Sequence, residues 1–169
     1  LLVNNLLTKD DLTNIYKNLN IIHSSKVKIK NNKLNIYKNY YEKVKIRIGN
    51  DKTTINKFGI KNFNKLSKLL IDYEKSKKGK FGLIHGDPVL SNIIKKNNED
   101  LVFLDPRGGL GENFAMCGDI NYDFAKIYQS LYGYENIILD KKIDHDYLKV
   151  LRSHFENLIM SEKKIKDIY

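Results

Sequence analysis

Apolar residues recur at helical spacing in several separate parts of the chain. In residues 9–23 they fall three or four positions apart, which places them on one face of a helix. Thr8, followed three residues later by Asp11, is a variant of the capping box that begins helices. The same spacing predicts further helices over residues 60–75, 119–131 and 144–164.

Single residues at the ends of these helices predict where they begin and stop. His23 ends the first helix, where a lone histidine is expected at the surface or in a cap rather than as a metal ligand. Gly79, after the charged loop "KSKKGK", is the expected stop of the second helix. Asp119 is the expected N-cap of the third, and Gly133 closes it.

Residues 26–50 carry two competing patterns. The stretches "KVKIK" and "VKIRI" alternate like strands, whereas tyrosines and Val44 fit one face of a helix. We favour a helix over residues 36–47. The tyrosine-rich part, residues 37–41, could stack nucleic-acid bases, but packing against a core is the commoner reason for such a cluster.

From Phe81 the pattern changes to short apolar runs separated by turn residues. The runs "NII" and "LVFL" flank "KKNNED", which predicts a β-hairpin whose Asn97-Asn98 pair suits positive φ angles. The expected fold class is therefore α+β and mainly helical, in a single domain over residues 1–169. The chain of 169 residues is long enough to bury a core.

The formal net charge of +10 raises the possibility of a nucleic-acid-binding module. The excess is almost all lysine, however, whereas bidentate hydrogen bonding to bases and phosphates favours arginine. Lysine, asparagine and isoleucine are abundant along the whole chain, so we interpret most of the charge as solvated surface. Nucleic acid is thus not the expected partner, and a nucleic-acid-binding module stays as the lesser alternative.

The sequence contains no apolar run long enough to span a membrane and no signal or transit peptide at its start. The lone Cys117 rules out a disulfide within the chain and is expected to be a packed structural thiol. A cytoplasmic location is the simplest expectation. The absence of an initiator Met suggests that the chain begins within a longer protein.

Three oxygen-bearing side chains are expected to converge in the middle of the chain. Asp87 and Asn92 lie five residues apart in "HGDPVLSN", where Pro88 disfavours a regular helix, and Asp105 ends the second strand of the hairpin. Oxygen ligands of this kind suit Mg²⁺, which is usually bound through one or two carboxylates together with substrate phosphates. A nearby carboxylate that does not bind the metal could accept a proton from a hydroxyl, as in phosphoryl transfer.

These residues carry a resemblance to a known family. "HGDPVLSN" is similar to the catalytic-loop motif His-Gly-Asp-x-x-x-x-Asn of the aminoglycoside phosphotransferase and choline kinase-like enzymes, which share the protein-kinase-like fold. "VFLDPRGG" resembles a branch found among phosphotransferase-like proteins of surface-polysaccharide loci. "GDINYDFAKIYQSLYG" resembles the helix start that follows in the family, and "LTNIYKNLNIIHSS" resembles the helix that opens its C-terminal lobe.

The resemblance implies a role for each matching residue. Asp87 is the implied catalytic base, and Asn92 and Asp105 are the implied ligands of the Mg²⁺ that accompanies ATP or GTP. His85 and Asp123 are implied to support the loop. Arg107 falls two residues after the metal-binding aspartate rather than three, and two roles stay open for it: pairing with a phosphate, or holding the glycine-rich segment.

The resemblance covers a C-terminal lobe only. About 80 residues precede the loop, and nothing in them resembles the sheet, phosphate loop and lysine of the family's N-terminal lobe. The expected activity is γ-phosphoryl transfer to a hydroxyl of a small molecule, a sugar or an amino alcohol, with poor turnover in the absence of that lobe. The alternative from another class is a noncatalytic kinase-like domain used for binding or scaffolding.

Overall fold

The computed structural model describes residues 4–26, 34–48, 51–96, 100–110, 113–114 and 116–166. The chain is mainly helical, with 61% helix and 9% strand, and its strands form small two-stranded antiparallel sheets. The expected mainly helical α+β class is confirmed at this level. None of the helices in the described part of the chain has both the length and the apolar character needed to cross a bilayer.

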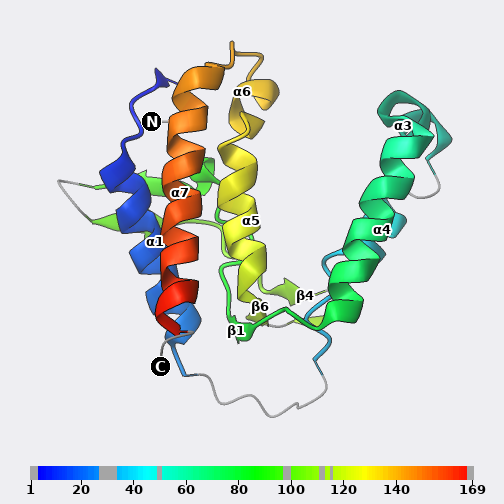
Figure 1. Cartoon of the computed structure of the whole chain (residues 1–169), viewed down its shortest axis with the longest axis horizontal. Coiled ribbons are helices and arrows are strands. Elements are labelled where there is room, and N and C mark those ends of the chain that lie inside the picture. Colours follow the sequence, from blue (N-terminus) through cyan, green and yellow to red (C-terminus); the bar gives the residue numbers. More distant parts are fainter. Residues whose placement is uncertain are drawn as a thin grey trace.

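Three helices run side by side and form the core: α1 (Lys9–Ser24), α5 (Ile120–Ser130) and α7 (His145–Lys166) (Figure 1). The apolar stripes predicted from the sequence meet at their centre. The fully buried side chains of the core are Leu12, Leu19, Ile127, Leu131 and Phe155. Each contributes about 1.5–3 kcal/mol through the removal of apolar surface from water. Burial of these side chains therefore stabilises the three-helix bundle.

The caps of these helices follow the sequence closely. The side chain of Thr8 accepts a hydrogen bond from the N–H of Asp11, and the Asp11 carboxylate accepts one from the N–H of Thr8. The predicted capping box of α1 is therefore confirmed. Gly133, with a φ of 88°, separates α5 from the short helix α6 (Tyr134–Ile138), which the sequence pattern did not predict.

A second group of helices stands apart from the bundle: α2 (Tyr41–Ile48), α3 (Lys52–Phe58) and α4 (Ile60–Ser76) (Figure 1). No described residue of these three helices is fully buried. The predicted helix over residues 36–47 begins later, at Tyr41, because residues 36–40 form turns. The turn residue Tyr37 is buried, as expected for core packing.

Two further features of this region differ from what the sequence pattern indicated. α3 was not predicted; it begins where the side chain of Asp51 accepts a hydrogen bond from the N–H of Thr54, and it is too short to show periodicity. α4 does not stop at Gly79. It ends at Ser76, and its C-cap Lys77 takes the left-handed conformation that a glycine was expected to supply.

The predicted hairpin is confirmed in its strands: β2 (Ile93–Lys95) pairs antiparallel with β3 (Leu101–Phe103). Its turn at Asn97-Asn98 lies outside the described residues. A second pair, β4 (Gly109–Leu110) with β5 (Asn113–Phe114), occupies part of the glycine-rich segment. The 3-10 helix η2 (Leu90–Asn92) leads directly into β2.

A third strand pair joins β1 (Phe81–Leu83) to β6 (Cys117–Asp119), with Leu83 opposite Cys117. It was not predicted, because its two strands are distant in sequence and too short to show a pattern. β1 leads into the loop that contains Asp87, and β6 leads into α5. The pairing therefore places the start of α5 beside this loop. Cys117 is buried in it, and burial raises the pKa of its thiol, as expected of a packed structural cysteine.

Asp119 joins the second helix group to this sheet. Its carboxylate accepts a hydrogen bond from the N–H of Asn121, so the predicted N-cap is confirmed. It also accepts bonds from the hydroxyls of Tyr40 at 2.7 Å and Tyr73 at 2.5 Å, and from the N–H of Lys80 at 2.9 Å. Asp119 is thus more than a cap: it ties α4 and the chain before α2 to the start of α5.

Candidate functional site

Asp87 lies in a buried loop between β1 and η2, in which every residue from 84 to 89 is buried. Gly86 makes the sharp turn of this loop with a φ of 83°. A Cβ at this position would lie 2.9 Å from the carbonyl oxygen of Arg107, so only glycine fits without rearrangement. The N–H of Arg107 donates to the carbonyl oxygen of His85 at 2.8 Å, which joins the loop to the chain after the hairpin.

Asp123 holds the loop from the first turn of α5. One carboxylate oxygen accepts the N–H of His85 and the other accepts the N–H of Gly86, each at 2.8 Å. Asp123 is fully buried, so these charge-assisted hydrogen bonds lie away from water, where they are strongest. The resemblance implied a supporting role for Asp123, and these are the contacts through which such support would act.

His23 completes this arrangement from the end of α1. Its Nε2 lies 2.9 Å from Oδ2 of Asp123, and its side chain is only 4% exposed. The expectation of a surface or cap residue was wrong. Helical periodicity identifies the residues of one face, but it does not show that the end of α1 packs against Phe124 of α5.

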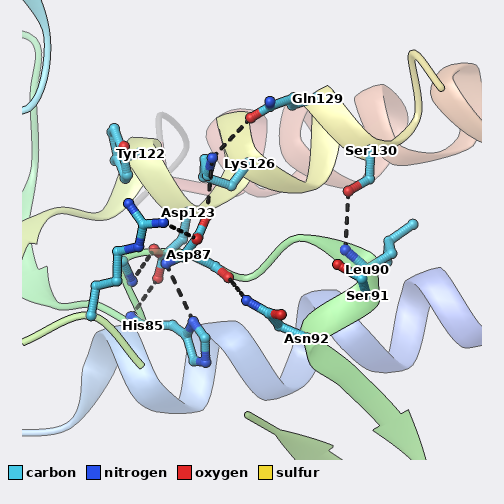
Figure 2. Close-up of polar contacts among 12 residues, drawn as sticks. His85, Asp87, Leu90, Ser91, Asn92, Tyr122, Asp123, Lys126, Gln129 and Ser130 are labelled. Atoms are coloured by element: carbon cyan, nitrogen blue, oxygen red, sulfur yellow. Dashed lines mark hydrogen bonds and ion pairs between the residues drawn. The ribbon is translucent and has the colours of Figure 1, made fainter. Parts of the chain in front are cut away.

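The carboxylate of Asp87 faces two cations (Figure 2). Nη2 of Arg107 lies 2.8 Å from Oδ2, and Nζ of Lys126, which reaches down from α5, lies 3.0 Å from Oδ1. The Lys126 contact has the distance of an ion pair but not the angles of a hydrogen bond, since Oδ1 accepts no hydrogen bond from a described residue. The single negative charge of the buried Asp87 thus faces two positive charges.

His85 lies beneath Asp87 and packs against Phe103 of the hairpin. Its Nδ1 accepts a hydrogen bond from the N–H of Asp87 at 3.3 Å, which requires a ring nitrogen without a proton. Burial lowers the pKa of His85, although the charge of Asp123 opposes this effect. The neutral ring therefore suits a bracing residue better than a proton carrier.

Asn92 and Asp105 are brought to the same end of the hairpin. The side-chain amide of Asn92 donates to the backbone carbonyl oxygen of Asp87 at 3.0 Å, and the backbone carbonyl oxygen of Asn92 accepts the N–H of Leu104 at 2.8 Å. Asp105 follows immediately, exposed and with a φ of 54°. Only the NH₂ group of the Asn92 side chain is engaged in this way. Its side-chain oxygen has no donor among the described residues, so it is available to a cation.

The chemistry of these two residues fits a magnesium ion that is shared with a substrate. One carboxylate and one amide oxygen are too few to hold a metal alone, and the described residues contain no group of three or more His, Cys, Asp or Glu that could do so. Mg²⁺ commonly keeps several waters and takes the rest of its ligands from phosphates. The residues predicted for the metal therefore fit that pattern.

Two residues of the site were not predicted from the sequence. Lys126 follows Asp123 by three positions and so shares its helix face, a signal that could have identified it. Lys43 of α2 donates to the hydroxyl of Tyr122 at 2.8 Å and has no local signal. Burial lowers the pKa of Lys43 to about 8, and the positive charges of Arg47, Arg107 and Lys126 add to the effect.

No protein-family model matches the chain, and no curated protein or solved structure matches it either. What the chain does is therefore inferred from its own residues.

Proposed function

We propose that the chain is the C-terminal lobe of a kinase-like phosphotransferase, which transfers the γ-phosphoryl group of ATP or GTP to a hydroxyl of a small molecule. One observation carries the proposal: the Asp87 loop. A buried carboxylate lies in a loop shaped by Gly86 and held by Asp123, and its backbone accepts the amide of Asn92. Such a rigid setting suits a group that must position a reacting hydroxyl.

In this proposal Asp87 orients the acceptor hydroxyl and receives its proton. The acceptor oxygen forms a bond to the γ-phosphorus while the bond from that phosphorus to the β–γ bridging oxygen breaks. The nucleoside diphosphate leaves with the electrons of the broken bond. The reaction requires mainly positioning and charge stabilisation, because the transition state is loose and its charge is spread over the phosphoryl oxygens.

Asn92 and Asp105 are the residues that would hold Mg²⁺. When bound, the ion would offset the negative charge of the nucleotide phosphates. The side-chain oxygen of Asn92 has no donor among the described residues, and the exposed Asp105 follows Leu104, whose N–H donates to the backbone carbonyl oxygen of Asn92.

Both oxygens of the Asp87 carboxylate lie against cations, so in this proposal one cation moves when the acceptor hydroxyl binds. The side chain of Lys126 is 17% exposed and also donates to Gln129, whereas the side chain of Arg107 is 44% exposed. Arg107 is therefore the cation that moves at the lower cost.

The elements that cover the nucleotide phosphates in kinase-like enzymes have no counterpart in the described residues before Phe81, where the regular elements are helices. Activity would therefore need a further lobe from another segment. A noncatalytic kinase-like binding domain is the second candidate, and the pairing of both Asp87 oxygens with cations favours it.

The test is nucleotide turnover by the full-length protein that contains this chain, with Mg²⁺ and a panel of sugars and amino alcohols. We expect acceptor-dependent release of ADP or GDP that is lost in Asp87→Asn and on chelation of the metal. Asp72→Asn, an equal change on the exposed face of α4, is the matched control and should retain turnover. Turnover that survives in Asp87→Asn would refute the assigned base. Binding of Mg²⁺–nucleotide without turnover on any acceptor would favour the noncatalytic domain.

A further inference from the structure

Cationic side chains from three parts of the fold lie in the neighbourhood of Asp87: Arg107 and Lys126 contact its carboxylate, and Lys43 binds the nearby Tyr122. Lys43 and Arg47 come from α2, Arg107 from the chain after the hairpin, and Lys126 from α5. Burial and the positive charges of Arg47, Arg107 and Lys126 lower the pKa of Lys43, and the carboxylate of Asp87 opposes them. Like charges brought together in a half-buried place cost free energy unless an anion offsets them. The cluster is therefore short of negative charge.

The position of Lys43 is defined by contacts rather than by chance exposure. Its Nζ donates to the hydroxyl of Tyr122 at 2.8 Å and lies 5.2 Å from the centre of the same ring. The side chain of Lys43 is partly buried. A lysine without an ionic partner avoids the cost of desolvation by extending its ammonium group into water. The ammonium group has no carboxylate partner within ion-pair distance among the described residues.

The Lys43 end of this cluster lies on the side of Asp87 away from Asn92. In Figure 2 Tyr122, which binds Lys43, and Asn92 lie on opposite sides of Asp87. If the nucleotide phosphates bind near Asn92, the Lys43 side faces the acceptor. An anion there would come from the acceptor rather than from the nucleotide.

We infer that the acceptor is a phosphorylated hydroxyl compound whose phosphate group binds between Lys43, Arg107 and Lys126 and draws Arg107 away from Asp87. The identity of the acceptor rests on the proposed function; the phosphate site itself does not. A phosphate monoester carries close to two negative charges at neutral pH and several acceptor oxygens, which suits cations that arrive from separate elements.

The same contact makes Asp87 available. With the phosphate bound, the guanidinium of Arg107 leaves the Asp87 carboxylate and binds phosphate oxygens. Oδ2 of Asp87 can then accept a hydrogen bond from the acceptor hydroxyl. A neutral hydroxyl compound offers Arg107 no such partner, so the arginine stays on Asp87. Arg107 is thereby a specificity-determining residue that links the charge of the acceptor to access to the base.

The first experiment measures binding to the full-length protein by calorimetry, with inorganic phosphate and with the pair glycerol 3-phosphate and glycerol. We expect both phosphates to bind and glycerol not to. Lys43→Met should weaken phosphate binding by about tenfold, as expected for the loss of one charge-assisted contact. Lys43→Arg should restore it. Lys45→Met, the same change on the exposed face of α2, is the control and should bind like the wild type.

Competition identifies the source of the phosphate. If glycerol 3-phosphate binds equally well in the presence of Mg²⁺–ADP and of a nonhydrolysable triphosphate, the acceptor assignment is supported. Displacement by the triphosphate alone would show that the cluster binds the γ-phosphate, and would overturn it. Failure of both phosphates to bind, or equal weakening by Lys43→Met and Lys45→Met, would overturn the site.

Turnover separates this inference from the proposed function. We expect a clear preference for phosphorylated over neutral acceptors, and we expect Arg107→Gln to reduce that preference because neutral hydroxyls then reach Asp87 freely. Equal turnover of both acceptor types in the wild type would refute the inference and leave the phosphotransferase intact. Phosphate binding that depends on Lys43, without turnover of any acceptor, would keep the site and refute the phosphotransferase.

Discussion

The backbone N–H of Gly86 donates to Oδ1 of Asp123 at 2.8 Å, across 37 residues of sequence. The other oxygen of Asp123 accepts the neighbouring N–H of His85, so one carboxylate binds two consecutive backbone groups of the Asp87 loop. Both donors are buried. The shape of the loop therefore depends on a residue outside it.

Asp123→Asn should destabilise the protein strongly. An amide offers one oxygen, while its NH₂ group would face a backbone N–H, and the loss of a charge-assisted hydrogen bond costs about 1.5–3 kcal/mol. We expect the free energy of unfolding, measured with denaturant, to fall by about this amount. Asp72→Asn on the exposed face of α4 should leave it within about 0.5 kcal/mol. Equal stabilities of the two variants would show that Asp123 does not hold the loop.

Gly86→Ala should also be costly. Its φ of 83° is strained for any residue with a Cβ, and that atom would approach the Arg107 carbonyl oxygen to 2.9 Å. A residue forced into such a conformation costs about 1–3 kcal/mol. The measurement is the denaturant midpoint, compared with that of Gly109→Ala. Gly109 has no positive φ and nothing within 4 Å of its Cβ position, so its variant should unfold like the wild type. A Gly86→Ala protein of unchanged midpoint would contradict the described turn.

The tyrosines bound to Asp119 should make the protein sensitive to alkali. Burial, together with the hydrogen bond to Asp119, raises the pKa of Tyr73 above its usual value of 10.0. Since the folded pKa is the higher one, the stabilising effect is complete below about pH 10 and is lost as the pH rises further. We expect the free energy of unfolding to fall more steeply between pH 10 and 11.5 in the wild type than in Tyr73→Phe.

The matched control for this titration is Tyr41→Phe, which removes a tyrosine hydroxyl from the start of α2 and leaves Asp119 with both of its tyrosine partners. Its stability should follow the wild-type curve across the same range. Lysines titrate there as well, but they are common to all three proteins, so the difference between the curves isolates Tyr73. Parallel curves for wild type and Tyr73→Phe would show that the hydroxyl is not bound to Asp119.

Lys43 should titrate apart from the other lysines. Its pKa of about 8 has burial as the largest cause, followed by the neighbouring positive charges. NMR of labelled lysine side chains should show one signal with a midpoint near 8 that is absent in Lys43→Met. In Arg107→Gln this midpoint should move upward, because one repelling charge is gone. A midpoint at the usual 10.5 would place Lys43 in open water.

Local pattern determined much of this protein. The stripes of α1, α4, α5 and α7, the capping box at Thr8 and the strands of the hairpin follow from interactions within a few residues, which sequence spacing records directly. The order of Asp87, Asn92 and Asp105 along the chain also predicted that they would share one end of the hairpin. For each of these features, the residues that decide it are close neighbours in sequence.

Only the tertiary structure decided what surrounds Asp87. The pairing of β1 with β6, the burial of His23 on Asp123, and the approach of Lys43, Arg107 and Lys126 join residues that are distant in sequence. Such contacts depend on how the two helix groups dock, which no local spacing records. Charge and burial at a site act through space rather than along the chain. The sequence therefore predicted the candidate carboxylate, and the fold determined which cations oppose it.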